Sequence, residues 1–358
     1  MKKNILVAPL NWGLGHATRC IPIIHHLIKH GFNPIVASDG LALEILRKEF
    51  PDVVLLTLPS YQIEYAKNGK NFKWKLIKNS PKMISAILEE KKIVKKWVQL
   101  YQLSGIISDN RLGVRNKNVP SVFITHQLNV LTGNTTKITT KLHLNIIKKF
   151  DACWVPDFKE KPNLTGKLGH LAKTPTNVNY IGPLSRLSFQ NSDKKYDLMI
   201  LLSGPEPQRS MLEEILRTEA LKYPGNVLFV KGIVESDQEQ STLKNITFYN
   251  FMNASQLEVA INESEMVLCR SGYTTIMDLA KLGKKAYFIP TPGQYEQEYL
   301  AKRLQKQGFY PYCDQNDFKI ENLADIDNYT AIRTIELDLD WKKLFSVFTA
   351  HPELSMPL

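Results

Sequence analysis

Short apolar runs alternate with longer amphipathic stretches along this chain, and no other feature constrains the fold as much. The first series of runs is NILVAPL, NPIVASD, DVVLLTL, SGIISD and SVFITH, rich in Val and Ile and bounded by Gly, Pro, Asn or Asp. Between the first two lies ATRCIPIIHHLIKHG, which predicts a helix that ends at Gly31. Strands that alternate with helices form βαβ units around a parallel sheet, so the predicted fold class is α/β.

A second series of the same kind begins near residue 196 and comprises YDLMILLSG, NVLFVKG, NITFYNF, MVLCRSG and KAYFIPT. Because 358 residues are too many for one ordinary core, we predict two doubly wound, Rossmann-like domains that face each other across a cleft. The predicted parts are an N-terminal domain at residues 1–183, a C-terminal domain at 184–340 and a tail at 341–358. The hinge is expected between about Pro175 and Asp193, and a helix after Trp341 is expected to pack back across the cleft.

The composition indicates a cytoplasmic protein. No apolar stretch approaches the roughly 18 residues that span a bilayer, and the first apolar run is too brief for a signal peptide. The cysteines Cys20, Cys153, Cys269 and Cys313 are far apart, with no C-x-x-C pair, which favours reduced thiols over a zinc site. We therefore predict no cofactor and no bound metal.

The net charge of +11 is concentrated in one segment. Residues 67–96 carry ten lysines against Glu89 and Glu90, and apolar residues such as Phe72 and Trp74 lie among them. A basic segment of this kind suits an anionic membrane surface, which would make the protein peripheral at the inner face of the cytoplasmic membrane. The equal alternative is a solvated helix whose lysines only keep the protein in solution. Nucleic acid is not predicted as a partner.

The stretch PLNWGLGHATR, residues 9–19, follows the first predicted strand. Gly13 and Gly15 allow a tight turn and close approach to a ligand, and the following helix start offers free N–H groups. The dinucleotide fingerprint is absent, because no glycine follows three residues after Gly15. His16 lies at the predicted cleft and titrates near neutral pH. It is a candidate catalytic residue, and a helix-capping or merely exposed histidine is the alternative.

Two further strands end in polar residues. SGIISDNR places Asp109 at the carboxyl end of the fourth strand, where it can reach the same cleft as His16. An aspartate bonded to the far nitrogen of a histidine orients the ring and stabilises its charged form. A turn or cap residue is the alternative for Asp109. The fifth strand ends in ITHQLN, and His126 and Gln127 would either contact a bound molecule on the acceptor side or close a turn.

The most specific stretch is VLCRSGYTTIMDLAKLGKKAYFIPTPGQYEQEYLAKRL, residues 267–304. A strand ends, Ser271 and Gly272 turn the chain, and a helix opens with Thr274 and Thr275. Free N–H groups, a positive dipole end and hydroxyls make this turn a ready anion site.

Side chains suited to a sugar follow that turn. Asp278 lies one helical turn further on and can accept hydrogen bonds from sugar hydroxyls. Gln294, Gln297 and Glu298 follow the next strand, and amides and carboxylates suit a polyol because they donate to or accept from its hydroxyls.

Residues 267–304 resemble the C-terminal signature of glycosyltransferase family 28. The resemblance implies the two-domain GT-B fold, a nucleotide-sugar donor, an inverting transfer and no metal. It also implies contacts with the diphosphate and ribose of UDP for Ser271, Gly272, Thr275 and Asp278. The family usually has Glu at the position of Asp278 and paired glutamines where this chain has Gln297 and Glu298, so the nucleotide and the sugar stay open.

The resemblance extends more loosely to other segments. Gly15 and His16 match the end of the first glycine loop of the family. The stretch LLSGPEPQR resembles the second glycine loop of the family. Its prolines leave fewer backbone N–H groups for a phosphate, and Arg209 is in a position to compensate for them. NITFYNFM resembles the segment that packs on the nucleobase. The residues predicted to bind the nucleotide sugar are Gly13, Gly15, Ser203, Gly204, Arg209, Phe248, Tyr249, Arg270, Ser271, Gly272, Thr274, Thr275, Asp278, Gln294, Gln297 and Glu298.

The predicted function is an inverting glycosyltransferase that moves a sugar from a nucleotide donor, UDP by resemblance, to an acceptor hydroxyl. His16 would remove the hydroxyl proton and Asp109 would steady the imidazole. Because the lysine-rich segment lies in the acceptor domain, a lipid-linked or cell-envelope acceptor is one hypothesis. The alternatives are a nucleotide-sugar epimerase of the same fold and a non-catalytic nucleotide-sugar-binding protein.

Overall fold

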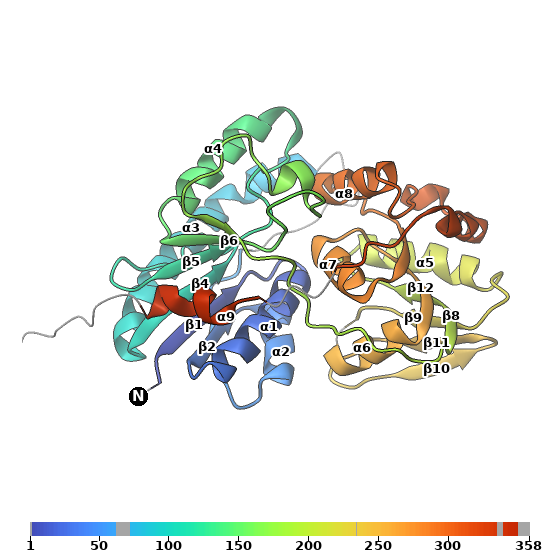
Figure 1. Cartoon of the computed structure of the whole chain (residues 1–358), viewed down its shortest axis with the longest axis horizontal. Helices are drawn as coiled ribbons and strands as arrows, with labels where there is room; N and C mark the ends of the chain where they lie inside the picture. The colour runs from blue at the N-terminus through green and yellow to red at the C-terminus, as the bar shows by residue number, and fades with distance from the viewer. Residues whose placement is uncertain (1, 62–71, 234, 335–338, 350–358) are drawn as a thin grey trace, which may run out of the picture.

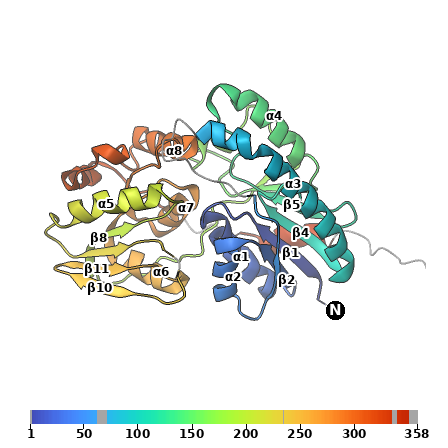
Figure 2. The same ribbon diagram turned by 180° about the vertical axis from the view of Figure 1, so that it is seen from behind.

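The structure is a computed structural model that describes residues 2–61, 72–233, 235–334 and 339–349, with the backbone alone for residues 72–81. It has two lobes, each built on one sheet with helices on both faces (Figure 1 and, from behind, Figure 2). The predicted α/β class with two doubly wound halves is therefore confirmed.

The N-terminal lobe holds a seven-stranded parallel sheet in the order β3-β2-β1-β4-β5-β6-β7. Its strands are β1 (Asn4–Pro9), β2 (Asn33–Ser38), β3 (Val54–Thr57), β4 (Leu103–Asp109), β5 (Ser121–Ile124), β6 (Ala152–Val155) and β7 (Val178–Tyr180). Its helices are α1 (Gly15–Lys29), α2 (Gly40–Glu49), α3 (Phe72–Leu100) and α4 (Thr136–Ile147), with short 3₁₀ turns η2 (Gly133–Thr135) and η3 (Gly166–Leu168). The central strand β1 is apolar throughout because it is buried on both faces: Ile5 and Val7 join the core on the α1 side, and Leu6 and Ala8 join the core on the α3 side.

The C-terminal lobe holds a six-stranded sheet in the order β10-β11-β9-β8-β12-β13, in which β10 and β11 pair antiparallel and the other neighbours pair parallel. Its strands are β8 (Tyr196–Leu201), β9 (Val227–Val230), β10 (Gln240–Leu243), β11 (Ile246–Tyr249), β12 (Ser264–Cys269) and β13 (Lys285–Phe288). Its helices are α5 (Gln208–Ala220), α6 (Ala254–Asn262), α7 (Tyr273–Leu282) and α8 (Tyr295–Lys306), followed by the 3₁₀ segments η4 (Gln315–Asp317) and η5 (Ile320–Asn328).

Three strands were not predicted from the sequence. β6 and β7 extend the first sheet at one edge, and β7 occupies part of the stretch from Pro175 to Asp193 that was predicted as a hinge. The connection between the sheets is therefore shorter than predicted and runs from about residue 181 to 195. All four residues of β10, QSTL, are exposed and three of them are polar, so β10 lacks the apolar pattern by which strands are predicted.

The chain returns to the N-terminal lobe after η5. Helix α9 (Trp341–Phe345) and the turn η6 (Ser346–Phe348) lie against the first lobe, where α9 is drawn in red in Figure 1. Trp341 stacks on His26 with ring centroids 4.1 Å apart, and Phe348 packs edge-on against Trp154. The residues HPELSMPL of the predicted tail lie outside the described residues.

The two lobes touch where helices α1 and α7 begin. The hydroxyl of Thr274 donates a hydrogen bond to the backbone oxygen of Gly15 over 3.2 Å. Glycine at residue 15 permits this approach without a shift of Thr274, because a Cβ there would lie 2.8 Å from Thr274 Oγ1 and 3.3 Å from Thr274 Cβ. The N-terminal ends of two helices from different lobes are thus held side by side.

The substitution Gly15→Ala tests this contact. Within a helix, Ala is normally more stable than Gly by about 0.5–1 kcal/mol. At this partly buried first position, the clash with Thr274 should instead cost about 1–3 kcal/mol. We therefore expect a lower melting temperature for G15A by circular dichroism. The double variant G15A/T274A should recover part of the loss beyond what T274A shows alone. A G15A protein as stable as the wild type would show that the helix starts are not in contact.

Candidate active site

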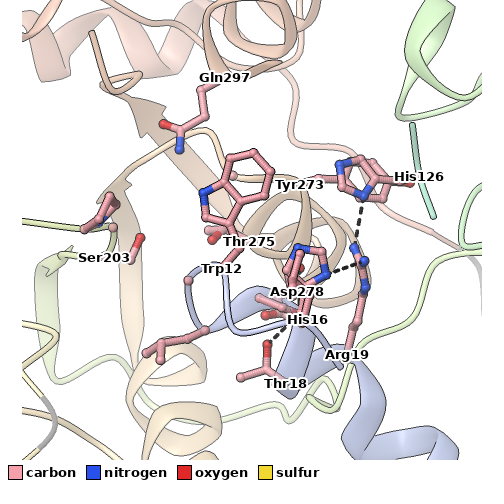
Figure 3. A pocket seen from close by; sticks show the side chains of 18 of the residues that line it. Trp12, His16, Thr18, Arg19, His126, Ser203, Tyr273, Thr275, Asp278 and Gln297 are labelled. Atoms are coloured by element: carbon pink, nitrogen blue, oxygen red, sulfur yellow. Dashed lines mark hydrogen bonds between the residues drawn. The ribbon is translucent and has the colours of Figure 1, made fainter. Parts of the chain in front are cut away.

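A cavity of about 550 Å³ lies between the lobes (Figure 3). The segments that follow β1, β4 and β5 line it from the N-terminal lobe, and those that follow β8, β12 and β13 line it from the C-terminal lobe. The carboxyl ends of both parallel sheets therefore face one space, as the fold class requires. The predicted site residues that line this cavity are Gly13, Gly15, His16, His126, Gln127, Ser203, Gly204, Gly272, Thr274, Thr275, Asp278, Gln294 and Gln297.

Two helix starts face the cavity. Helix α1 begins at Gly15 and helix α7 at Tyr273, and neither N-cap residue, Leu14 or Gly272, has a side chain bonded to the free backbone N–H groups. Gly15, Gly272 and Thr275 all line the cavity. Unpaired N–H groups and two positive dipole ends make this part of the cavity suited to a phosphate or diphosphate.

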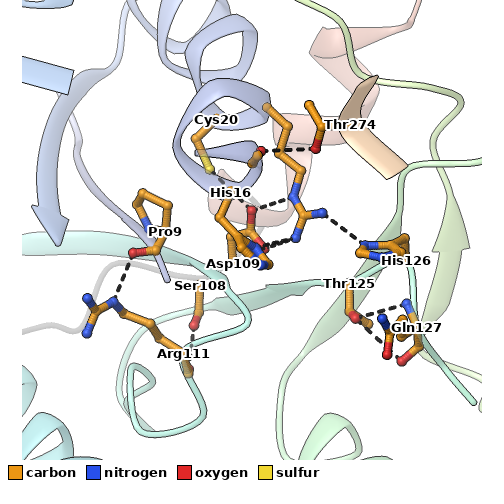
Figure 4. A network of polar contacts seen from close by, with 12 residues as sticks. Pro9, His16, Cys20, Ser108, Asp109, Arg111, Thr125, His126, Gln127 and Thr274 are labelled. Carbon is orange, nitrogen blue, oxygen red and sulfur yellow. Dashed lines mark hydrogen bonds and ion pairs between the residues drawn. The ribbon is translucent and has the colours of Figure 1, made fainter. Parts of the chain in front are cut away.

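His16, Asp109 and Arg19 form a buried cluster on the N-terminal side of the cavity (Figures 3 and 4). His16 Nδ1 lies 3.0 Å from Asp109 Oδ1 and 2.7 Å from Arg19 Nη2. Arg19 donates from Nε to Asp109 Oδ2 over 2.5 Å and from Nη2 to Asp109 Oδ1. Asp109 lies behind His16 and does not line the cavity itself. The structure thus joins the two candidate catalytic residues by a hydrogen bond.

The electrostatics of the cluster favour a neutral imidazole and an ionised carboxylate. Burial would raise the pKa of Asp109, but Arg19 and His16 outweigh it and hold that pKa well below its usual range. Burial and the Arg19 cation lower the pKa of His16 from 6.5, against the raising effect of Asp109. His16 Nδ1 lies between an acceptor, Asp109 Oδ1, and a donor, Arg19 Nη2, so two tautomers compete there. The tautomer with its proton on Nδ1 donates to Asp109 and leaves Nε2 free to accept a proton, which is the state that a general base requires.

Arg19 was not among the residues predicted from the sequence, although it belongs to the same PLNWGLGHATR stretch. Its spacing of three residues from His16 puts both side chains on one face of α1, and this was the available signal. Nothing in the sequence indicates that Arg19 would share the carboxylate of Asp109.

His126 and Gln127 reach across the cavity to the other lobe. His126 Nε2 donates to Glu296 Oε1 over 2.7 Å, and Gln127 Nε2 donates to Glu296 Oε2. The ring of His126 also stacks on Tyr273, with ring centroids 4.5 Å apart. Glu296 was missed in the sequence, although it lies between the predicted residues Gln294 and Gln297.

Asp278 lies on the C-terminal side of the cavity and accepts a hydrogen bond from Ser185 Oγ over 2.6 Å. Burial raises the pKa of Asp278 to about 6 against the lowering effects of Ser185 and Arg186. Arg186, in the connection between the sheets, also lines the cavity, and its Nε is buried without a partner among the described residues. Arg186 was not predicted, because sequence alone does not indicate that the linker passes the cavity.

Two predicted cationic contacts are corrected by the structure. Arg209 pairs with Glu206 and Glu213, each over 2.6 Å, and does not line the cavity, so it does not replace lost N–H groups at a phosphate. Arg270 is buried and donates to four acceptors of the lobe itself: the backbone oxygens of Gln208, Ile289 and Pro290, and the side-chain oxygen of Gln315. Both side chains hold loops in place instead of facing a ligand.

The predicted nucleobase contacts are also corrected. Phe248 is buried and packs against Phe229, with ring centroids 5.2 Å apart, because it points to the α5 side of the sheet. Tyr249 points to the opposite face and packs against the other core cluster. The residues of this segment that line the cavity come after the strand, at Phe251 and Met252.

Ser271 and Glu298 shape the neighbouring loop. Ser271 is buried and donates to the backbone oxygen of Gln297 over 2.9 Å, and Glu298 accepts from the backbone N–H of Gly293 over 2.7 Å. Neither lines the cavity, so direct contacts with a bound nucleotide sugar are not supported for them. They hold the loop that presents Gln294 and Gln297.

Sequence comparisons relate the chain to glycosyltransferases. Residues 212–328 match the model of the glycosyltransferase family 28 C-terminal domain. The chain is 25% identical over 338 residues to the UDP-N-acetylglucosamine–N-acetylmuramyl-(pentapeptide) pyrophosphoryl-undecaprenol N-acetylglucosamine transferase of Haemophilus ducreyi, covering 91% of this chain and 89% of that protein. It is 22% identical to an uncharacterized glycosyltransferase of Methanosarcina acetivorans, covering 86% of this chain and 84% of that protein.

Solved structures share the fold. Acinetobacter baumannii MurG aligns with a TM-score of 0.52 at 13% identity, over 98% of this chain and 94% of that chain. The spinosyn rhamnosyltransferase SpnG complexed with thymidine diphosphate aligns with a TM-score of 0.59 at 14% identity, over 98% and 97% of the two chains. These structures confirm the predicted GT-B fold. The family model and the named relatives confirm the predicted resemblance to family 28.

The raised pKa of Asp278 predicts how the stability of the unliganded protein depends on pH. The native state holds the proton of Asp278 up to about pH 6, while the unfolded state releases it near its ordinary pKa of 3.8. The stabilisation from the neutral carboxyl is thus fully present below about pH 4 and is lost as the pH rises through 6. The variant D278N lacks this loss, so its melting temperature relative to the wild type should rise between about pH 4 and pH 6 and stay level above that. A difference in melting temperature that does not change with pH would contradict a buried, shifted carboxyl.

Proposed function

We propose that this chain, a family 28-like glycosyltransferase with the GT-B fold, moves a hexose from a UDP-sugar to an acceptor hydroxyl with inversion at the anomeric carbon. One observation carries the proposal. His16, with Asp109 bonded behind it, and the bare start of helix α7 face the same cavity from opposite lobes. A base and an anion site on opposite sides of a cavity are what a displacement of a nucleoside diphosphate by a hydroxyl requires.

The donor would lie mainly on the C-terminal lobe. Its diphosphate would bind the N–H groups at Gly272 and Thr275, and its ribose hydroxyls would bind Asp278. The hexose would then face Gln294 and Gln297, whose amides line the cavity. UDP is chosen because the Haemophilus relative is named for a UDP-sugar, and thymidine diphosphate, found with SpnG, is the competing nucleotide.

The reaction would proceed in one displacement. The acceptor oxygen forms a bond to the anomeric carbon as the bond from that carbon to the diphosphate oxygen breaks, and the acceptor proton passes to His16 Nε2. Asp109 stabilises the imidazolium that forms. The leaving UDP keeps both bonding electrons, and the helix starts at α7 and α1 stabilise its charge.

The acceptor would enter from the N-terminal lobe. There the cavity is lined by a group of apolar and aromatic side chains: Leu10, Trp12, Tyr61, Met83, Leu112, Val130 and Leu131. Such a lining suits an acceptor with an apolar portion. Because the name of the Haemophilus relative includes an undecaprenol-linked acceptor, a lipid-linked acceptor is the form we propose.

A membrane-bound acceptor would be reached through helix α3. Residues 67–71 of the lysine-rich segment lie outside the described residues, but Lys91, Lys92, Lys95 and Lys96 are exposed on the helix. Two apolar side chains of the same helix, Ile84 and Leu88, are 55% and 59% exposed. Across the described residues, we find no helix with the length and apolar character of a membrane span. We propose that α3 binds the anionic surface of the cytoplasmic membrane.

The proposed reaction is tested by incubating the protein with UDP-GlcNAc, UDP-glucose, UDP-galactose and dTDP-glucose, with and without a polyprenyl-linked acceptor. We expect UDP release that depends on the acceptor.

Removal of the base in H16A should lower kcat by about 100- to 10,000-fold, and D109N should lower it by a similar order. UDP affinity by calorimetry should stay nearly unchanged in both variants. The exposed residue His25 provides the control variant H25A.

Other outcomes of that experiment identify the alternatives. An isomerised sugar formed without any acceptor would identify an epimerase. UDP-sugar binding with no turnover, unaffected by H16A, would identify a non-catalytic binding protein. No affinity for any nucleoside diphosphate would overturn the proposal altogether.

Membrane binding is tested by replacing Lys91, Lys92, Lys95 and Lys96 with Glu. We expect binding to vesicles with 30% phosphatidylglycerol to fall by at least about tenfold, because each lysine near an anionic surface contributes about 1 kcal/mol. Glu at Lys244, Lys302, Lys306 and Lys319, exposed on the other lobe, is the matched control and should bind as the wild type. Unchanged binding by the α3 variant would remove α3 as the membrane surface.

A further inference from the structure

Glu296 connects the donor side of the cavity to the base on the acceptor side. It lies in the first turn of α8, between Gln294 and Gln297, and its side chain is 27% exposed. Both of its oxygens accept from the opposite lobe, one from His126 Nε2 over 2.7 Å and the other from Gln127 Nε2. None of the roles proposed above for the donor or the acceptor uses Glu296.

Hydrogen bonds continue from Glu296 to the base, and Figure 3 shows the part that runs from His126 through Arg19 to His16. Arg19 Nη1 lies 3.0 Å from His126 Nδ1. A guanidinium can only donate, so His126 Nδ1 accepts and the His126 proton resides on Nε2, where it is donated to Glu296. The same guanidinium contacts Asp109 and His16 Nδ1. One chain of contacts therefore runs from Glu296 through His126 and Arg19 to His16.

The side chains connected in this series of contacts together carry one excess negative charge, so one added proton makes the group neutral. Around His16 lie the Arg19 cation from α1, the Asp109 carboxylate from β4, neutral His126 after β5, and Glu296 from α8. Tyr273 from α7 and Cys20 from α1 stay protonated, because burial raises the pKa of both. With both carboxylates ionised and both histidines neutral, the group carries a net charge of −1. A proton on His16 makes the group neutral, whereas without Glu296 the same proton would create a buried net positive charge.

Burial would raise the pKa of Glu296, but His126, His16 and Arg19 outweigh it and keep that pKa below its usual value. The carboxylate is therefore ionised at neutral pH. Its charge is part of the environment of His16 only while the lobes are together, because Glu296 is carried by α8 and His16 by α1.

We infer that Glu296 is a positioning residue of the base, which supplies from the donor lobe the negative charge that His16 needs to accept the acceptor proton. The inference rests on the proposed function. It means that the base reaches full strength only when the lobe that would carry the donor is in place against the acceptor lobe. The acceptor hydroxyl would then lose its proton to His16 when a donor sugar is in place for the acceptor oxygen to attack.

Direct contact of Glu296 with the donor sugar is the competing explanation, because its side chain also lines the cavity. The two explanations differ in what they change. A sugar contact affects the donor KM, whereas a charge that acts on His16 affects kcat and the pH at which His16 protonates.

The isosteric variant E296Q removes the charge and keeps an oxygen that can accept from His126. Loss of a negative charge disfavours the imidazolium and lowers the pKa of His16. The acid limb of the kcat profile should therefore move to lower pH by at least about half a unit. A base weakened by half a unit should lower the plateau kcat by at most about threefold, with the donor KM unchanged. The control is E214Q, an exposed carboxylate on α5, which should behave as the wild type.

A second measurement does not depend on turnover. In protein with ¹⁵N-labelled histidine, the NMR titration of His16 should move to lower pH in E296Q by the same amount as the kinetic limb. An unchanged His16 titration would overturn the inference, as would an increase in donor KM with an unmoved acid limb. If the wild-type protein turns over no nucleotide sugar, the proposed function fails, and the NMR titration still decides whether Glu296 acts on His16.

Discussion

The active site depends on a carboxylate that is fully buried. A charge removed from water is strongly destabilising unless it is paired and hydrogen-bonded, and Asp109 meets that condition with two bonds from Arg19 and one contact with His16. The backbone of Asp109 also accepts from Leu10 N–H, and Asp109 pairs with Pro9 in the sheet. The backbone of Asp109 thus ties the loop after β1 to the end of β4, and its carboxylate holds the start of α1 and gives His16 its position. Replacing Arg19 would leave the Asp109 carboxylate without a cation in the core of the lobe.

The second constraint is the close approach of the lobes. Glycine at position 15 lets the start of α1 touch the start of α7, and Thr274 bonds directly to its backbone. Two dipole ends then face one cavity, which makes an anion site that neither lobe forms alone. Glu296 adds a negative charge from the same side as the proposed donor. The two sides of the cavity therefore differ. The helix ends make one side positive, where a diphosphate would leave, and His16 makes the other side able to accept a proton, where a hydroxyl would attack.

Much of the site was predictable because parallel sheets place their carboxyl ends at one edge. That rule located His16, Asp109, His126 and the turn before α7 without any knowledge of strand order. It failed where side-chain direction decides the outcome. Phe248 has the residue type of a base-stacking side chain, but it lies within β11 and points into the core, and Phe251 after the strand reaches the cavity instead. Arg209 and Arg270 failed for a related reason, since local carboxylates and backbone oxygens satisfy them more readily than a ligand would.

The sequence by itself determined the α/β class, the duplication of the doubly wound pattern and the positions of the helix starts, because these follow from local periodicity and from the conformations that glycine and proline allow. Tertiary structure alone decided that Arg19 shares the Asp109 carboxylate, that Glu296 bonds to His126 across the cavity and that α9 returns to the first lobe. Such contacts join residues far apart in the chain, and each partner looks like an ordinary surface residue in its own segment. Only the strand order and the approach of the lobes bring the charges close enough to influence one another's protonation.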